Sequence, residues 1–513
     1  MASATAVDER ALVFIGFMGA GKTTAARAAA SALGGRATDS DAVIEQRLGS
    51  SVEAFFAAHG EAAFRAEEEQ VVCALLDAPP GPVLSLGGGA VGSAKVRAAL
   101  ARHVVVLLDV APGLAWQRAG RGRPLARDRA RFDALHAERA PLYAALADVV
   151  LTDSSRDAVR RATPAMAALR AAPPRTHMLW ARAASADYPV YVGDGLLGAG
   201  PRGAGGRAFL VTDTTVGPLY AERAGAVAAD VRVAPGEAAK TWEQAGSVLR
   251  ELARAGMEQS DHVLALGGGV VGDLAGFCAA TYQRGVGVVQ LPTTLVAQVD
   301  SAYGGKTGVD LPEGKNYAGA YHQPRAVLAD PSVLATLPPA ELAAGWAEVV
   351  KTALIAGGRL WERVCRDGAA ADAELVLACA RTKLGVVAED ERDAGRRQVL
   401  NLGHTVGHAI ETATGYTRYR HGEAVGLGLL AALTLSGRPV LRAEVKSLLT
   451  ARGLPVTLDP AVDREAVLAA MQRDKKRRNG TLAFVLVDVP GNVRPGCAVA
   501  PGEIEHGLAE LAG

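Results

Sequence analysis

Residues 11–24, ALVFIGFMGAGKTT, indicate the fold of the N-terminal part of this chain. Its second part, GFMGAGKTT, fits the spacing G-x-x-x-x-G-K-[ST], with an apolar strand before it and the helical segment TTAARAAASAL leading away from it. Glycines let successive N–H groups turn toward phosphate oxygens, Lys22 supplies positive charge to the β- and γ-phosphates, and Thr23 is expected to bind Mg²⁺. The motif predicts a nucleoside triphosphate site formed by Gly16, Gly19, Gly21, Lys22, Thr23 and Thr24.

Short apolar segments alternate with helix-length segments around this motif and again in the middle of the chain. The strands expected in the first series are ALVFIGF, PVLSLGG, HVVVLLDV and DVVLTD, residues 11–17, 82–88, 103–110 and 148–153. Those of the second series are RAFLVTD, HVLALGGG and VGVVQLPTT, residues 207–213, 262–269 and 286–294. This alternation is typical of parallel α/β sheets, whereas long alanine- and leucine-rich segments predict helices after about residue 331.

The length of 513 residues is too great for one hydrophobic core and indicates about three domains. The segment TPAMAALRAAPPRT, residues 163–176, has the proline pair and the alanine and arginine content of a linker. We therefore expect a phosphate-binding α/β domain over residues 1–165, a linker over 166–177, a second α/β domain over 178–330 and a mainly helical domain over 331–513.

Composition argues against several classes of protein. A net charge of +1 gives no basic field for nucleic acid, and no stretch of about 18 uncharged apolar residues predicts a membrane span. The start, MASATAVDER, lacks an apolar core of signal type, and the five cysteines are scattered without a C-x-x-C pair. We expect a cytoplasmic protein with reduced thiols that acts on small molecules, with neither nucleic acid nor a membrane as partner.

The phrase LSLGGGAV at residues 84–91 nearly repeats as LALGGGVV at residues 264–271. The flanking residues do not align further, so a duplicated domain is not indicated. Glycines at the end of a strand let the backbone approach a ligand without obstruction by a Cβ atom. We interpret the two phrases as parts of two different nucleotide or anion sites, with two ordinary tight turns as the alternative.

Charged residues accompany the phosphate-binding motif in the first half. TDSD contains Asp39 and Asp41, which alternation along a strand would place on one side, where they could share a cation or polyol hydroxyls. A solvated turn is the alternative for this pair. Arg65 in GEAAFRAEE, Arg123 in GRGRPL and Arg139 in ERAPLY would each be read as surface residues if considered alone.

Together these motifs resemble shikimate kinase from residue 10 to about 165, through GFMGAGKTT, DSD, GEAAFRAEE, GGGAV, RPL and R-x-x-x-Y. The resemblance implies a P-loop NTPase domain with a parallel sheet that transfers phosphoryl from ATP, with Mg²⁺, to shikimate. It also implies that Asp39 lies near Mg²⁺ and that Arg123, in an arginine- and glycine-rich lid, reaches the transferred group. The substrate contacts it implies are Asp41 for the hydroxyls, Arg65 and Arg139 for the carboxylate, and Gly87, Gly88 and Gly89 for the pocket wall.

Two glycine-rich motifs stand out in the second half. LALGGGVVGDLAGF places glycines after a strand with Asp273 close by, where an adenine dinucleotide could lie. In LVAQVDSAYGGKTGVDLPEGKNYAGAYHQP, residues 295–324, lysines within a glycine-rich loop indicate anion contacts, and a flexible solvated loop is the alternative.

A third group of motifs combines one carboxylate with several imidazoles: Glu348 in GWAEVVK, His404 and His408 in NLGHTVGHAIE, and His421 in RHGEAVG. Such hard and borderline ligands suit Zn²⁺. His404 and His408 have i, i+4 spacing and share one helix face. A lone histidine is more often structural, but three of the ten histidines fall within 18 residues, which favours a metal site.

These motifs resemble 3-dehydroquinate synthase over residues 178 to about 500, through GGGVVGDLAGF, LPTTLVAQVDSAYGGKTGVD, AEVVK, EDERD, LNLGHTVGHA and HGEAVG. The resemblance implies a Rossmann-like α/β domain and a mainly α-helical domain with the site between them. It implies NAD and a divalent metal, Zn²⁺ or Co²⁺, as cofactors and a homodimer through this half. The implied reaction cyclises 3-deoxy-D-arabino-heptulosonate 7-phosphate to 3-dehydroquinate: NAD transiently oxidises a hydroxyl, phosphate leaves, hydride returns, the ring opens, and an aldol step closes the carbocycle.

The same resemblance implies roles for individual residues. The metal ligands it implies are Glu348, His404 and His421. The NAD contacts it implies are Asp213, Glu237, Lys240, Gly268, Gly269, Asp273, Thr293, Thr294, Lys306 and Lys315. The substrate and catalytic groups it implies are Arg284, Asp300, Lys306, Asn316, Lys351, Lys383, Arg397, Asn401 and His408, together with one of Lys475 and Lys476.

Two positions depart from the family pattern, namely Tyr321 in place of phenylalanine and Asp310 in place of asparagine. Asp310 adds a negative charge beside the anion-binding loop. We hypothesise a bifunctional enzyme whose two reactions are not consecutive, so direct channelling is not its obvious purpose. The alternatives are a metal-dependent polyol dehydrogenase for the second half, and a nucleotide-sensing module without turnover or another small-molecule kinase for the first.

Overall fold

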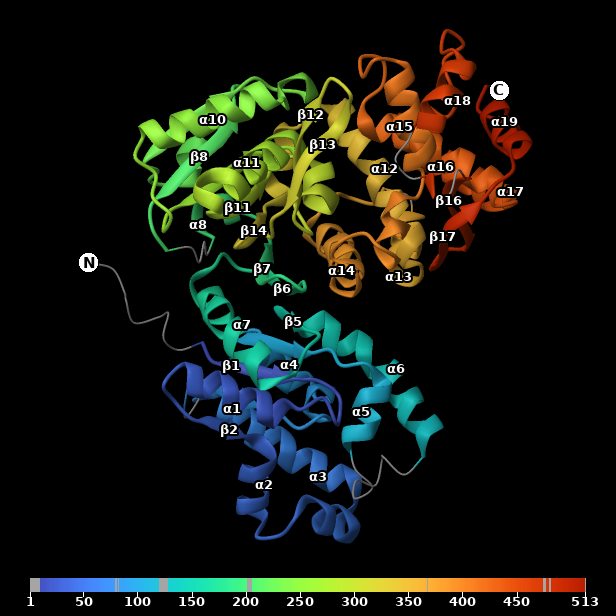
Figure 1. Ribbon diagram of the computed structural model, residues 1–513. Helices are drawn as coiled ribbons and strands as arrows, with labels where there is room; N and C mark the ends of the chain where they lie inside the picture. Colours follow the sequence, from blue (N-terminus) through green and yellow to red (C-terminus); the bar gives the residue numbers. More distant parts are fainter. Residues whose placement is uncertain are drawn as a thin grey trace. The chain divides into compact units, whose positions relative to one another are not determined.

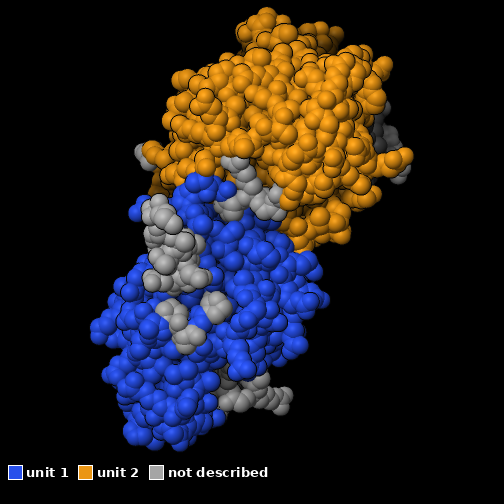
Figure 2. Space-filling view, turned by 90° about the vertical axis from the view of Figure 1, so that its left-hand side faces the viewer, with its two compact units in different colours: residues 1–180, 189–191, 199–201 blue, residues 181–188, 192–198, 202–513 orange. Residues whose placement is uncertain are grey.

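The computed structural model describes residues 10–512 apart from 79, 80, 82, 120–127, 201–204, 367, 474–476, 479 and 480 (Figure 1). The chain forms two compact units (Figure 2). The first comprises residues 1–180 with 189–191 and 199–201, and the second comprises residues 181–188, 192–198 and 202–513. None of the helices in the described part of the chain has the length and apolar character needed to cross a bilayer.

The first unit is a parallel sheet with helices, in strand order β2-β3-β1-β4-β5-β6. Its strands are β1 Leu12–Ile15, β2 Ala37–Asp39, β3 Val83–Ser85, β4 Val104–Leu108, β5 Val149–Leu151 and β6 His177–Arg182. Its helices are α1 Lys22–Ala32, α2 Ser40–Leu48, α3 Val52–Asp77, α4 Ala94–Leu100, α5 Pro112–Ala119, α6 Arg129–Leu146 and α7 Arg156–Ala168. The central strands β1 and β4 are fully buried, which explains their continuous apolar sequences.

Polar residues of the first unit gather where parallel strands end. β1 runs into the glycine loop, β2 ends at Asp39 and β3 leads to Gly87. Since the carboxyl ends of parallel strands lie at one edge of a sheet, these three loops meet there.

The segment 166–177, expected as a linker, is ordered in the structure. Helix α7 continues to Ala168, a 3-10 turn covers Leu169–Ala171, and β6 begins at His177. Met166 and Leu169 are buried, so they extend the apolar face of α7 and pack with the first unit.

The second unit begins with a parallel sheet in strand order β14-β11-β10-β8-β9. Its strands are β8 Ala208–Asp213, β9 Ala229–Val233, β10 His262–Gly267, β11 Gly287–Pro292 and β14 Ala326–Ala329. Helices α10 Trp242–Arg254 and α11 Gly269–Thr281 pack on alternate residues of β8, β9 and β10 in one buried apolar cluster. The short elements β7 Asp187–Val192 and α8 Leu196–Ala199 contribute residues to both units, and α9 Gly217–Tyr220 belongs to the second.

The glycine-rich stretch over residues 295–324, expected as a loop, is folded. It forms a π-turn over Ala297–Ser301 and a hairpin of β12 Lys306–Leu311 and β13 Gly314–Tyr321. Gly308 and Gly319 face each other across the hairpin, and a Cβ on Gly319 would lie 2.5 Å from the Thr307 carbonyl oxygen. The glycines thus serve close backbone packing in a sheet.

The rest of the second unit is mainly helical, as expected. Its helices are α12 Pro339–Ala356, α13 Gly358–Val364, α14 Ala373–Glu389, α15 His404–Ala413, α16 His421–Leu435, α17 Pro439–Ala451, α18 Arg464–Arg473 and α19 Pro501–Ala509. The strands β15 Arg477–Arg478, β16 Thr481–Val489 and β17 Asn492–Ala498, which we did not expect, form an antiparallel sheet.

Glycines let α16 approach its neighbours at backbone distance. A Cβ on Gly422 would lie 1.8 Å from the Ala344 carbonyl oxygen of α12, and one on Gly428 would lie 1.9 Å from the Gly403 carbonyl oxygen that precedes α15. These close contacts bring α12, α15 and α16 together near His404 and His421, which begin α15 and α16.

Candidate active sites

The glycine loop of the first unit closes around Lys22. Gly16, Gly19 and Gly21 have φ angles of +144°, +80° and +91°, and a Cβ on Gly19 would lie 2.0 Å from the Ala115 carbonyl oxygen. The Lys22 ammonium donates to the carbonyl oxygens of Gly16, at 2.9 Å, and Phe17, at 3.2 Å. The loop has the backbone freedom and the positive charge that a phosphate cradle needs.

Thr23, Asp39 and Asp41 are joined beside this loop. Thr23 Oγ1 donates to Asp39 Oδ2 at 2.6 Å, and the Asp41 N–H donates to Asp39 Oδ1 at 3.0 Å. The prediction that both aspartates lie on one side of a strand was wrong. Asp39 ends β2 and caps α2, whereas Asp41 lies in the first turn of that helix.

These residues line a cavity of about 550 Å³ that includes most of the predicted nucleotide contacts. Of the predicted residues, the lining includes Gly19, Gly21, Lys22, Thr23, Thr24, Asp39, Asp41 and Gly88. Arg118, Ser154, Ser155 and Arg156 also line it and were missed. Arg118 donates to Ser154 Oγ at 2.7 Å, a contact between distant parts of the chain that no local motif reveals.

Arg65, Gly89 and Arg139 line a second cavity, of about 570 Å³. Arg65 Nη1 lies 2.5 Å from Oε2 of Glu68, a buried residue that the sequence reasoning missed. Burial raises the pKa of Glu68, and the charge of Arg65 opposes that shift. The spacing of three residues on a helix is the signal that could have identified the pair.

The glycine turn that follows β3 has lining residues in both cavities. Gly88 lines the first cavity and Gly89 the second. The Gly88 carbonyl oxygen accepts hydrogen bonds from the Tyr143 hydroxyl at 2.5 Å and from Arg139 at 3.4 Å, which hold the turn to α6. A Cβ on Gly87 would lie 2.6 Å from Asp41 Oδ1, so this turn also leaves room for a polar side chain. Arg123 lies outside the described residues.

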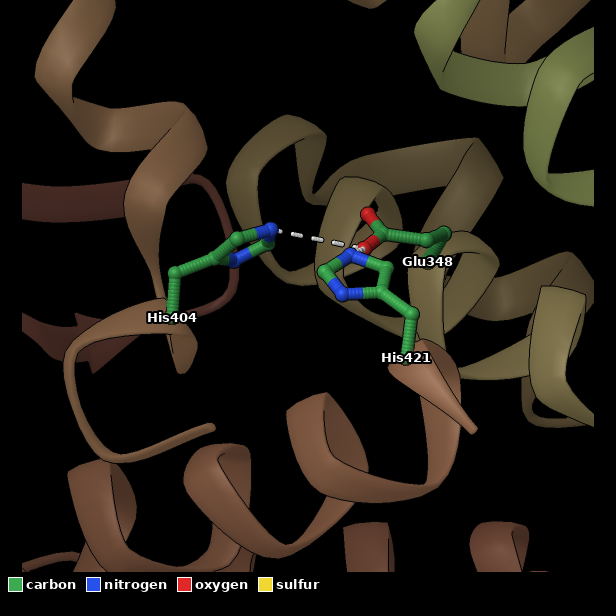
Figure 3. A group of neighbouring side chains, drawn as sticks. All are labelled: Glu348, His404 and His421. Atoms are coloured by element: carbon green, nitrogen blue, oxygen red, sulfur yellow. Dashed lines mark ion pairs between the residues drawn. The ribbon is translucent and has the colours of Figure 1, made fainter. Parts of the chain in front are cut away.

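In the second unit, three helices bring Glu348, His404 and His421 together (Figure 3). Glu348 lies on α12, His404 opens α15 and His421 opens α16. The Nε2 atoms of His404 and His421 lie 3.5 and 3.4 Å from Glu348 Oε1. The structure therefore brings together the three residues that the sequence singled out as candidate metal ligands.

The donor set fits a divalent cation. Glu348 is completely buried, and its Oε1 makes no hydrogen bond within the described part of the chain. Ligand atoms held by a tetrahedral ion with bonds of about 2.0–2.1 Å lie about 3.3 Å apart, close to the separations seen here. Burial alone would raise the pKa of Glu348, but Lys351 and His421 outweigh it and hold that pKa well below its usual range.

A second polar group adjoins this triad. Lys351 Nζ lies 2.5 Å from Glu348 Oε2 and 3.6 Å from Asp300 Oδ1. Lys383 Nζ lies 3.0 Å from Asp300 Oδ1 and donates to the Asp300 carbonyl oxygen at 2.8 Å. Asp300 occupies the π-turn, a distortion that occurs frequently at functional sites.

Predicted NAD residues occupy the carboxyl edge of the second sheet. Lys240 Nζ lies 2.7 Å from Glu237 Oε1 and 3.3 Å from Asp273 Oδ2. Burial would raise the pKa of Glu237, but Lys240 and Lys315 hold it at about 2. Gly268, at the start of α11, is so near Thr294 that a Cβ would lie 2.9 Å from its Cγ2 atom.

The flanking strand ends belong to the same edge. The Thr293 N–H donates to the Gly267 carbonyl oxygen, and Asp213, at the end of β8, accepts from the N–H groups of Thr215 and Val216. This edge is the crevice in which open α/β sheets bind ligands.

Asp310 has a structural contact. Its Oδ1 accepts a hydrogen bond from the Asn316 N–H at 2.7 Å, and Asn316 has a φ of +55° in the turn of the hairpin. Asp310 Oδ1 also lies 3.9 Å from Lys240 Nζ. The Asp310 carboxylate thus stabilises the hairpin turn and adds a negative charge near Lys240.

Three other predicted residues, Arg397, Lys306 and His408, make contacts within the second unit. Arg397 is buried and donates to the carbonyl oxygens of Glu391 and Gly304. Lys306 is half-exposed and pairs with Asp393 at 2.5 Å. His408 packs its ring 5.1 Å from that of His404.

Two more predicted residues, Arg284 and Asn401, lie in 3-10 turns. Arg284 lies exposed after α11 with a φ of +70°, and Asn401 ends the 3-10 turn before α15. Tyr321 donates its hydroxyl to the Arg392 carbonyl oxygen. Lys475 and Lys476 lie outside the described residues.

The sequence reasoning missed one buried carboxylate beside the triad, Glu411 on α15. It is 3% exposed, and its Oε1 lies 3.3 Å from Nδ1 of His421 and 3.3 Å from Nζ of Lys315. The available signal was its spacing, since Glu411 follows His404 by two helical turns and so shares its face.

Comparisons with known proteins give family matches in both units. Residues 18–170 match the family described as shikimate kinase, residues 230–344 match 3-dehydroquinate synthase N-terminal and residues 345–477 match 3-dehydroquinate synthase C-terminal. A 3-dehydroquinate synthase from Halorhodospira halophila is 46% identical over 350 residues, which are 64% of this chain and 98% of that protein. One from Symbiobacterium thermophilum is 45% identical over 353 residues, 63% of this chain and 98% of that protein.

Two solved structures resemble the second unit. A 2-deoxy-scyllo-inosose synthase complexed with carbaglucose-6-phosphate, NAD⁺ and Co²⁺ has a TM-score of 0.58 and 25% identity, covering 65% of this chain and 99% of that one. A 2-epi-5-epi-valiolone synthase from Streptomyces hygroscopicus subsp. jinggangensis with NAD⁺ and Zn²⁺ bound has a TM-score of 0.57 and 28% identity, covering 63% and 96%. The resemblances drawn from the sequence and the predicted fold class are confirmed.

Proposed function

Because this chain belongs to the 3-dehydroquinate synthase family and carries a shikimate kinase domain ahead of it, we propose that its two units catalyse two different reactions. The chain is a bifunctional enzyme of aromatic-precursor biosynthesis. The first unit phosphorylates shikimate with ATP to shikimate 3-phosphate. The second converts 3-deoxy-D-arabino-heptulosonate 7-phosphate to 3-dehydroquinate and phosphate. A polyol dehydrogenase and a non-catalytic nucleotide sensor are not favoured.

In the first unit, the residues would position two substrates and neutralise charge. Lys22 would exchange its carbonyl contacts for phosphate oxygens of ATP, while Thr23 and Asp39 would hold Mg²⁺. Asp41 would orient the hydroxyl that attacks. The residues proposed to bind the rest of shikimate are Arg65, Gly87, Gly88, Gly89 and Arg139, and Arg123 would reach the transferred phosphoryl group.

In the second unit, Glu348, His404 and His421 would hold Zn²⁺ or Co²⁺, and the carboxyl edge of the sheet would hold NAD. When bound, NAD accepts and returns a hydride, and the divalent ion polarises the oxygen at the carbon being oxidised. The side chains proposed for NAD are Asp213, Glu237, Lys240, Asp273, Thr293, Thr294, Lys306 and Lys315, with the backbone of Gly268 and Gly269.

The cations around Asp300 would bind the doubly anionic substrate. Lys351 and Lys383 share this carboxylate, so their ammonium groups are held in place before the substrate arrives. Arg397 is oriented by two carbonyl oxygens and would act in the same way. The leaving phosphate can take up a proton itself, so a dedicated strong base is not required. Arg284, Asn316, Asn401 and His408 are proposed as further substrate contacts.

The proposal for the second unit depends on one observation. Glu348, His404 and His421 converge beside the group formed by Lys351, Asp300 and Lys383. A metal-dependent dehydrogenase could use the triad, but a neutral polyol substrate does not require the cations Lys351 and Lys383. The test is an assay of the full chain for inorganic phosphate released from the heptulosonate phosphate, alongside ADP formed with shikimate. Net reduction of NAD with glycerol or another polyol, without phosphate release, would contradict the proposal.

The alkaline pH dependence of the second activity is expected to report Lys383. Burial lowers the pKa of Lys383 to about 8; Asp300 opposes this shift, while Lys351 and Arg397 reinforce it. As the cation is lost, kcat/KM should fall about tenfold per pH unit above pH 8. Between pH 8 and the usual value of 10.5 the unfolded state binds more protons. The contribution of this group to the free energy of unfolding therefore rises with pH in that window.

Lys383→Arg provides the check, because a guanidinium stays charged up to about pH 12. The decline of kcat/KM attributed to Lys383 should be absent from this variant below about pH 10. Shikimate phosphorylation should show the same pH profile in both proteins. A decline at the same pH in wild type and variant would show that another group titrates.

We also propose that the enzyme acts in the cytoplasm as a homodimer through its second unit, with functional domains over residues 1–165, 178–330 and 331–513. All five cysteines are unpaired in the structure, which fits a reducing compartment. The dimer is supported by the family resemblance. Light scattering of the full chain at micromolar concentration tests it, and a monomer mass would refute it.

A further inference from the structure

Glu411 lies behind the triad and contacts the imidazole of His421 on the side that faces away from Glu348. His421 Nδ1 lies 3.3 and 3.4 Å from the two carboxylate oxygens of Glu411, while its Nε2 lies 3.4 Å from Glu348 Oε1. The ring is thus held between two buried carboxylates. Metal-binding histidines commonly donate their second N–H to a carboxylate, which fixes both tautomer and orientation.

Glu411 is also the start of a chain of ion pairs toward the proposed NAD edge. Lys315 Nζ lies 3.3 Å from Glu411 Oε1 and 3.2 Å from Glu237 Oε1. Lys240 continues the chain, from Glu237 at 2.7 Å to Asp273 at 3.3 Å. Lys315 is therefore shared between a carboxylate that contacts the triad and one that lies with the proposed cofactor residues.

We propose that Glu411 is a positioning residue that orients His421 for the metal, and that Lys315 couples metal binding to NAD binding through Glu411 and Glu237. This inference rests on the proposed function of the second unit and adds a residue and a coupling that it does not require. If the ion fixes His421, it also fixes Glu411 and so Lys315. With Lys315 already ordered, less conformational entropy is lost when Glu237 and Lys240 are arranged to bind the dinucleotide.

A second interpretation of Glu411 involves the neighbouring His408. His408, Glu411 and His421 also offer three ligand atoms within 4.8 Å of one another. If they bound their own ion, Glu411 would be a ligand, and each chain would bind two ions. Lys315 argues against this arrangement because it pairs with Glu411 Oε1, the oxygen that also lies 3.3 Å from His421 Nδ1. In the triad, by contrast, Lys351 pairs with Glu348 Oε2 and leaves Oε1 for an ion.

The test is a Co²⁺ titration of the metal-free full chain, followed by visible absorbance, for wild type, Glu411→Gln and the control Glu362→Gln. Glu362 is an exposed carboxylate on α13. The proposal predicts one Co²⁺ per chain in all three proteins and a Kd about 10–100-fold weaker in Glu411→Gln alone. Unchanged affinity in a folded Glu411→Gln, or two ions per chain in wild type and one in this variant, would overturn it.

The coupling is measured separately, as the ratio of NAD Kd values without and with saturating Co²⁺. In wild type we expect a ratio of about 5 or more, the usual scale of coupling between sites. Lys315→Met should reduce this ratio to about 1 while its Co²⁺ affinity stays within about threefold of wild type. A ratio that survives in Lys315→Met would refute the coupling.

If Glu411→Gln does not fold, Glu411→Asp replaces it, with weaker Co²⁺ binding expected because the shorter side chain cannot reach His421 Nδ1. A wild-type chain that binds neither Co²⁺ nor NAD would refute the proposed function itself.

Discussion

Replacing Lys22 with alanine is expected to lower the rate of shikimate phosphorylation by about 10³-fold, the scale on which one cation acts on a transferring phosphoryl group. This corresponds to about 4 kcal/mol of transition-state stabilisation. The ammonium lies inside the glycine loop, bonded to the carbonyl oxygens of Gly16 and Phe17, so no other side chain of the loop carries a positive charge to the same place. ADP formation at saturating ATP and shikimate measures the loss.

Phosphate release by the second unit is the internal control for this variant, and it should stay at the wild-type rate. Arg27→Ala is the matched control, since Arg27 is an exposed cation on the same helix, α1. It should leave both activities within about twofold, as surface substitutions usually do. Phosphorylation by Lys22→Ala at more than a tenth of the wild-type rate would show that this loop is not the phosphate cradle.

Replacing His404 with alanine is expected to abolish phosphate release from the heptulosonate phosphate and to spare shikimate phosphorylation. His404 supplies one of the three atoms that point at a common centre, 3.5 Å from Glu348 Oε1. Loss of a residue behind a ligand costs about 10–100-fold in metal affinity, so loss of a ligand should cost more than about 100-fold. Equilibrium dialysis with Zn²⁺, with metal content measured per chain, gives the affinity independently of activity.

His506→Ala is the matched control for this variant, because His506 is an exposed histidine on α19. It should bind Zn²⁺ and release phosphate like the wild type. Together with Lys22→Ala, the variant completes a crossed design in which each substitution removes one activity and leaves the other. Unchanged Zn²⁺ affinity in a folded His404→Ala would eliminate the triad as the metal site.

Much of each site could be predicted because its signals are local. The loop from Gly16 to Thr24 depends on nine consecutive residues, and the shared face of His404 and His408 follows from one helical turn. The prediction was wrong where a backbone choice depended on packing. Asp41 lies on a helix because Asp39 caps that helix, and the glycine-rich stretch after Asp300 became a hairpin because the facing Gly308 and Gly319 let its two strands pair closely.

The amino-acid sequence alone was enough to identify the two families and the strand–loop–helix with the phosphate-binding motif, and to select Glu348, His404 and His421 as the residues proposed to hold a metal. Each of these depends on spacing within a few turns of chain or on motifs long enough to be specific. The three-dimensional fold was needed to show that the Arg65–Glu68 pair lines the second cavity and that Arg118 and Arg156 line the first. It was also needed to show that Glu411 contacts the outer nitrogen of His421. Those contacts depend on how helices pack, and a buried charge has no sequence signature until the groups that neutralise it are known.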